Sequence, residues 1–230
     1  EQTINTNLLG TINLVNACAK VGFQAFIQTG SSSEYGTKKQ PMKESDVLES
    51  HNLYGMTKAV ATLYCQAAAK KQGLPIVVMR PFAVYGPFEE QTRLIPTLVM
   101  SYLRGKSPKL SSPGSVRDFI FIEDLVSAYQ AAIEHIQKAK GEIFNVGGGV
   151  EHSVGEVADM VKNITGSDVQ PEYGQVRSNQ EEPEHWVADI SKAKRLLQWE
   201  PRYTLEKGLE KTVAWFRELD SKKLYGYYIP

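Results

Sequence analysis

The chain has 230 residues, of which 42% are hydrophobic and 23% charged, and its 26 basic and 26 acidic side chains give a formal net charge of zero. This is the composition of a globular protein with a substantial core. The balanced charge argues against binding to nucleic acid or to a membrane surface, because both require an excess of basic side chains. No apolar run approaches the roughly 20 residues of a membrane span, and Cys18 and Cys65 form no Cys-x-x-Cys pair. We therefore expect a cytoplasmic protein with free thiols.

The first 90 residues alternate between helical and strand patterns. Apolar residues at helical spacing predict an amphipathic helix over 3–20, and a short buried strand follows over 24–29. A polar loop over 37–50 leads into a second helix over 54–71, which precedes the β-branched strand and loop "LPIVVMRPFAVYGP". This alternation predicts an α/β fold in which a parallel sheet carries helices on its faces.

After residue 90 the order of helices and strands is less regular. A dinucleotide-binding α/β protein is expected to carry a Gly-x-Gly-x-x-Gly loop behind its first strand. The chain has no such loop, because in the triple glycine at 147–149 the third glycine of the motif is replaced by His152. We expect an ordinary turn there. The segments "VRDFIFI" and "EIFNV" are predicted strands, and the predicted helices cover residues 94–103, 123–136, 153–165, 190–197 and 205–219.

Tyr54 and Lys58 are four residues apart on a predicted helix and therefore share one face of it. A phenol acts as a base near neutral pH only with help from nearby positive charge, which a lysine one turn away and a nicotinamide ring can supply. The segment "TGSSSEYG" at 29–36 ends the preceding strand. Its serines either cap a turn or supply a hydroxyl that meets the tyrosine.

These segments resemble, in the correct order, those of the extended short-chain dehydrogenase/reductase family, the NAD(P)-dependent nucleotide-sugar epimerases, dehydratases and reductases. The resemblance rests on "NTNLLGTINLVNAC", "TGSSSEYG", "YGMTK", "RPFAVYGP", "RDFIFIEDL", "FNVGGG", "DISKAKRLLQWEP" and "LEKGLEKTVAWF". It implies a Rossmann-like doubly wound parallel sheet, without the N-terminal βαβαβ portion that holds the cofactor pyrophosphate, and a smaller α/β substrate-binding portion. We expect the cofactor-binding portion to comprise residues 1–88 and about 116–147, and the interleaved substrate-binding portion to comprise about 89–115 and 148–230.

Matched residue by residue, the resemblance implies a catalytic set of Ser31, Tyr54 and Lys58. NAD or NADP would contact Tyr54 and Lys58 and, in addition, Thr29, Gly30, Pro81 and Phe82. A nucleotide-sugar substrate would contact Ser32, Ser33, Ala83, Leu94, Ile95, Arg117 and Arg177, although Ala83 stands where many relatives carry a hydrogen-bonding asparagine. The four histidines show no ligand spacing, so we expect no metal site. The helices at 3–20 and 54–71 resemble the dimer bundle of the family, which implies a homodimer.

The residues after Ser31 bear on the reaction type. Family members that dehydrate sugars carry an acid directly after the catalytic hydroxyl, whereas Ser32 and Ser33 occupy these positions here and Glu34 comes one place later. The resemblance therefore favours C4 epimerisation of a nucleotide sugar, with reduction of a 4-keto-6-deoxysugar as the alternative. Because the glycine-rich loop is absent from the chain, a second alternative is a non-catalytic fragment that acts as an assembly or binding module.

Overall fold

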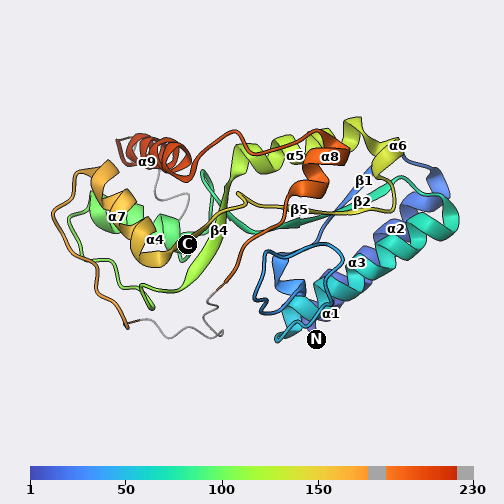
Figure 1. Cartoon of the computed structure of the whole chain (residues 1–230), viewed down its shortest axis with the longest axis horizontal. Coiled ribbons are helices and arrows are strands. Elements are labelled where there is room, and N and C mark those ends of the chain that lie inside the picture. Colours follow the sequence, from blue (N-terminus) through green and yellow to red (C-terminus); the bar gives the residue numbers. More distant parts are fainter. Residues whose placement is uncertain (176–184, 222–230) are drawn as a thin grey trace.

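A computed structural model of the chain describes residues 1–175 and 185–221. Two sheets form the framework, each with its own helices (Figure 1). The strands are β1 (Phe26–Thr29), β2 (Ile76–Pro81), β3 (Ala83–Tyr85), β4 (Val116–Phe121), β5 (Ile143–Val146) and β6 (Glu151–Ser153). The helices are α1 (Gln2–Ile4), α2 (Gly10–Val21), α3 (Leu53–Gln72), α4 (Leu94–Leu103), α5 (Ile122–Glu134), α6 (Ile136–Ala139), α7 (Val154–Thr165), α8 (Ser191–Leu197) and α9 (Leu205–Ser221), with a π turn η1 (Asn5–Leu9) and a 3-10 turn η2 (Ser32–Glu34).

The first sheet is parallel, with the strand order β1-β2-β5. Side chains of a strand point alternately to its two faces, and β2 shows this directly. Ile76 and Val78 pack against α2 and α3, whereas Val77 and Met79 pack against α5, α6 and α8. Figure 1 shows the same three layers, with the strands between the two groups of helices. The prediction of an α/β fold with helices on both faces of a parallel sheet is confirmed.

The second sheet has the order β3-β4-β6, in which β3 and β4 are parallel and β4 and β6 antiparallel. Helices α4, α7 and α9 cover it and enclose the largest apolar core, to which Phe119 and Phe121 of β4 contribute. Strand β4 therefore pairs with β3 and β6 rather than with β2. The division of the chain into two interleaved portions stays a prediction.

No helix of the described residues is long and apolar enough to cross a membrane.

Candidate active site

The candidate site lies where β1 and β2 end, next to the first turn of α3. Parallel strands bring their carboxyl ends to the same edge of a sheet, where ligands of open α/β folds bind. The amide of Gly30 donates to the carbonyl of Met79 (2.7 Å), so the chain leaving β1 stays beside β2 for one more residue. The loop that follows contains the predicted catalytic serine.

Residues 31–35, named here the serine turn, form a tight 3-10 turn with Ser31 as its N-cap. Ser31 Oγ accepts a hydrogen bond from the amide of Ser33 (3.1 Å), and the amide of Ser31 donates to Glu34 Oε1 (2.9 Å). This reciprocal pair is a capping box. A hydroxyl has one hydrogen and two lone pairs. The Ser31 hydroxyl therefore keeps its hydrogen for another acceptor while its oxygen is held by the turn.

Tyr54 and Lys58 lie in the first two turns of α3, as predicted. Asn52 caps this helix by accepting a hydrogen bond from the Gly55 amide (2.8 Å). Tyr54 is 46% exposed, and Lys58 Nζ lies 5.8 Å from the centroid of its ring. Lys58 Nζ also donates to the carbonyl of Thr29 (3.0 Å), which ties α3 to the end of β1. Burial lowers the pKa of Lys58, and the nearby charge of Glu34 acts in the opposite direction.

A glycine permits the close approach of α3 to the serine turn. A Cβ atom at Gly55 would collide with the carbonyl oxygen of Ser33 and with Ser50 Oγ. Because Gly55 directly follows Tyr54, the tyrosine is held next to the serine turn. The structure thus brings the turn that carries Ser31, Tyr54 and Lys58 to one edge of the sheet, as the sequence predicts. Their catalytic roles stay predictions.

The other predicted cofactor residues lie around the same edge. Thr29 is exposed at the end of β1, and its Oγ1 lies 2.9 Å from the hydroxyl of Tyr129 on α5. Pro81 ends β2, and the amide of Phe82 donates to the carbonyl of Val146 (2.9 Å). The Phe82 side chain is buried with those of Tyr35, Met42 and Ala188. Contacts of these residues with a cofactor stay predictions.

The predicted substrate residues are more dispersed. Ser32 is buried in the serine turn, where its Oγ accepts a hydrogen bond from Trp186 Nε1 (3.3 Å). Ala83 begins β3, and Leu94 and Ile95 begin α4, with Ile95 buried in the core of the second sheet. Arg117 lies on β4 and donates to the Val116 carbonyl (2.6 Å) and to Ser115 Oγ (3.1 Å). Arg177 lies outside the described residues.

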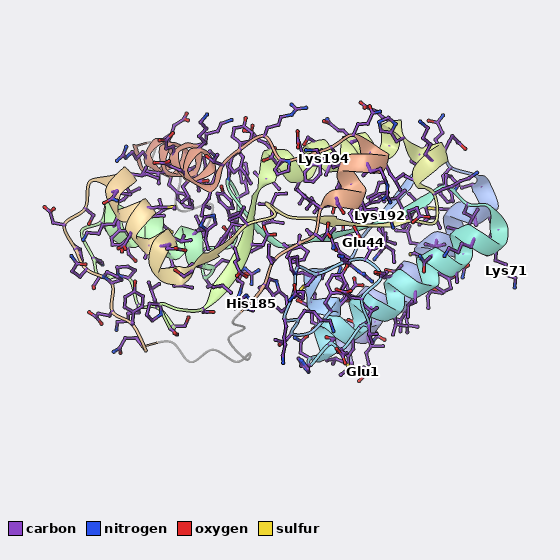
Figure 2. The ribbon with its side chains drawn as sticks, in the orientation of Figure 1. Glu1, Glu44, Lys71, His185, Lys192 and Lys194 are labelled. Carbon is purple, nitrogen blue, oxygen red and sulfur yellow. The ribbon has the colours of Figure 1, made fainter. Side chains whose placement is uncertain are left out.

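The chain between residues 185 and 190 crosses from the second sheet to the loop after β1. Met42 pairs with this segment through two backbone hydrogen bonds of 2.8 Å, one to Val187 and one from Asp189. His185 and the Trp186 amide both contact the carboxylate of Glu151, each at 3.0 Å. Figure 2 shows His185 between the second-sheet part and the α3 side of the molecule. It also shows Glu44, whose carboxylate accepts from the Asn145 amide (2.8 Å), close to Lys192 of α8.

Three residues near the site were not predicted: Glu34, Arg80 and Trp186. A local signal exists for Glu34, because the spacing Ser31-x-x-Glu34 is the sequence signature of a capping box. Arg80 opens the "RPFAVYGP" segment, but the sequence alone does not show that its side chain turns into the interior. Trp186 has no local signal, because its contact with Ser32 spans 154 residues. Within the described ranges, no group of three or more His, Cys, Asp or Glu residues is placed to hold a metal ion.

Comparison with known proteins identifies the family. Residues 1–147 match the family described as "NAD dependent epimerase/dehydratase family". Among curated proteins, UDP-glucuronate 4-epimerase of Thermodesulfobacterium geofontis is 30% identical over 94% of this chain and 66% of its own length. The chain therefore belongs to the NAD-dependent epimerase/dehydratase family, and the predicted family and Rossmann-like fold are confirmed. It spans about two thirds of the length of that relative.

Solved structures of similar proteins have the same fold as this chain. UDP-glucuronic acid 4-epimerase from Bacillus cereus, in complex with UDP-glucuronic acid and NAD, has a TM-score of 0.87 at 31% identity, over 94% of this chain and 68% of that one. UDP-glucose 4-epimerase from Thermotoga maritima, with UDP-glucose, has the same TM-score and identity over 94% and 70% of the two chains. The three relatives named here are described as epimerases of UDP-sugars, and the Bacillus cereus structure contains NAD.

Proposed function

We propose that the protein is a nucleotide-sugar C4 epimerase that works by transient oxidation at C4, with Ser31, Tyr54 and Lys58 as its catalytic residues. One observation supports this choice over dehydration. The carboxylate of Glu34, the acid of the serine turn, is fully buried and is paired with Arg80 at 2.7 Å. An acid held in this way cannot exchange protons with a substrate, and the two positions before it are serines. The serine turn therefore lacks the acid/base pair that removal of water requires.

The residues at the site suit a nicotinamide dinucleotide. Lys58 Nζ uses one of its three N–H groups on the Thr29 carbonyl, which leaves two for the hydroxyls of a ribose. The Bacillus cereus relative solved with NAD supports NAD as the cofactor, and NADP is the alternative. When bound, the nicotinamide would supply the acceptor and the donor of hydride.

The chain's own residues would manage the proton. Tyr54, as phenolate, takes the proton of the C4 hydroxyl, and the positive charge of Lys58 favours the phenolate. The Ser31 hydroxyl donates a hydrogen bond to the oxygen on C4 and so stabilises the charge that develops there. After the ketone has rotated to present its other face, Tyr54 returns the proton to the same oxygen, now on the epimer. We assign Arg117 to the diphosphate of the substrate, because a guanidinium suits two phosphate oxygens at once.

Cofactor stoichiometry tests the proposal. The full-length gene product is incubated with UDP-glucose or UDP-glucuronic acid, and the product is followed by NMR together with NADH absorbance. The expected result is formation of the C4 epimer with no net change in NADH. Tyr54→Phe should lower turnover by about 10²–10⁴, whereas Tyr64→Phe, on the same helix with its hydroxyl on Asn16, should not. Net consumption of NADPH with a 4-keto sugar would instead identify a reductase.

We also propose that the protein is a homodimer through α2 and α3. Exposed apolar side chains follow one stripe of α3, where Met56, Val60 and Leu63 are 50%, 47% and 53% exposed. Leu9 and Leu14 extend the apolar surface on η1 and α2, at 47% and 55% exposure. Apolar surface of this kind marks an interface, and a second copy would present the same stripe about a twofold axis.

A further inference from the structure

The carboxylate of Glu34 has three hydrogen-bond partners and no exposed surface. Its Oε1 accepts from the Ser31 amide (2.9 Å) and from Thr62 Oγ1 (2.9 Å), and its Oε2 accepts from Arg80 Nε (2.7 Å). A Cβ atom at Gly30 would lie 2.5 Å from Oε1, so the carboxylate packs directly on that glycine. A buried charge with this many charge-assisted bonds has one well-defined position.

The three partners belong to the three elements that carry the candidate catalytic and cofactor residues. Ser31 is in the serine turn itself. Thr62 lies on α3, four residues beyond Lys58 and eight beyond Tyr54, so the three side chains share one face of the helix. Arg80 is on β2, directly before Pro81. The Glu34 carboxylate therefore joins the serine turn, the catalytic helix and the second strand at one point.

The far end of the serine turn is held by the same arginine. Arg80 Nη1 donates to the hydroxyl of Tyr35 (2.8 Å), and the guanidinium carbon lies 4.6 Å from the centroid of the Tyr35 ring. Tyr35 in turn donates to Asn145 Oδ1 on β5 (2.6 Å). Burial raises the pKa of Tyr35, so its hydroxyl keeps the proton that it donates. Both ends of the turn are thus fixed to the sheet.

We propose that Glu34 and Thr62 are positioning residues that hold Ser31 Oγ in register with Tyr54. This inference rests on the proposed function, in which the Ser31 hydroxyl donates to the substrate oxygen. The hydroxyl is aimed by its bond from the Ser33 amide, and the turn that sets this bond is tied by Glu34 to Thr62, on the helix that carries Tyr54. Displacements of about 1 Å in such a site cost about a hundredfold in rate, so the tie between turn and helix affects catalysis directly.

Thr62→Val tests the hydrogen bond from Thr62 to Glu34 with little change in the shape of the side chain. It removes the hydroxyl that links α3 to Glu34 and leaves the Glu34–Arg80 pair intact. Thr212→Val is the matched control, because Thr212 is also fully buried, donates to a carbonyl of its own helix and lies on α9. In the full-length gene product, Thr62→Val should lower kcat about tenfold with little change in KM, and Thr212→Val should leave kcat unchanged. An unchanged kcat in Thr62→Val would overturn the inference.

A double mutant separates positioning from general structure. If Thr62 acts through Ser31, Thr62→Val should cause no further loss of kcat once Ser31→Ala is present. Equal losses from Thr62→Val in both backgrounds would refute positioning and leave the proposed function untouched. If Ser31→Ala itself leaves kcat unchanged, the catalytic role of Ser31 is refuted, and so is the proposal that Glu34 and Thr62 position it.

Hydrogen exchange gives a readout that does not depend on activity. In Thr62→Val the amides of Ser31 and Ser33 should exchange faster than in the parent chain, while the amides in the middle of α3 keep their protection. The Thr212→Val control should leave exchange in the serine turn unchanged. Unaltered exchange at both serines in Thr62→Val would show that the turn does not depend on the tie, and would overturn the inference.

Discussion

Replacing Glu34 by glutamine tests the buried ion pair on which the serine turn depends. The amide keeps an oxygen for the Ser31 amide but loses the negative charge, and Arg80, which is 1% exposed, remains buried without a counter-charge. Removing one partner of a buried pair costs about 3–5 kcal/mol. In a chain of this size 1 kcal/mol shifts Tm by about 2–4 °C, so Glu34→Gln should lower Tm by about 6–20 °C.

Urea denaturation followed by circular dichroism measures this loss, and a second substitution identifies its cause. Arg80→Met removes the stranded charge, and apolar replacement of both partners of a buried pair is often close to neutral. Tyr35 loses its donor in that variant but still donates to Asn145. The double variant Glu34→Gln/Arg80→Met should therefore be more stable than Glu34→Gln alone. A loss below about 1 kcal/mol in the single variant, or a double variant less stable than the single, would refute the reasoning.

Three further predictions follow from the structure. Burial raises the pKa of the Glu89 carboxyl from 4.5 to about 8. Between these two pH values the folded chain keeps a proton that the unfolded chain releases, so the free energy of unfolding falls as pH rises. Glu89→Gln should remove up to about 1.4 kcal/mol per pH unit of this slope in urea titrations, and equal slopes in the two proteins would contradict the prediction. Gly55→Ala should lower the free energy of unfolding by about 1–3 kcal/mol or more, and should also lower kcat, because the added methyl group meets the serine turn. Gly10→Ala, with its nearest contact at 3.4 Å, serves as the control. Leu63→Glu should convert the dimer to a monomer in sedimentation velocity, whereas Val126→Glu, at an exposed residue of α5, should not; a parent that is already monomeric would refute the dimer.

The regular elements with strong periodicity could be predicted closely. Helix α4 begins and ends at the predicted residues, and α3 extends one residue beyond the prediction at each end. The short strands β3 and β6 were missed because three residues carry too little periodicity, and both are held by pairing with β4, which is more than 25 residues distant along the chain. The catalytic candidates could be matched because each lies in a local motif. The contact between Trp186 and Ser32 could not, because it exists only once the two sheets are assembled.

The position of Glu34 in the sequence shows why an acid that comes one residue later changes the chemistry of the serine turn. In a 3-10 turn successive side chains are about 120° apart and residues i and i+3 eclipse each other. Ser31 precedes the turn as its N-cap, and Glu34, the third residue of the turn, reaches back to the Ser31 amide in a capping box and faces Arg80 in the interior. An acid at Ser32 or Ser33 would project in another direction; Ser32, for one, faces Trp186. A carboxylate one or two places earlier would be placed for the proton transfer of dehydration, whereas at position 34 it is bonded to the Ser31 amide and to Arg80, which supports the proposed epimerisation over dehydration.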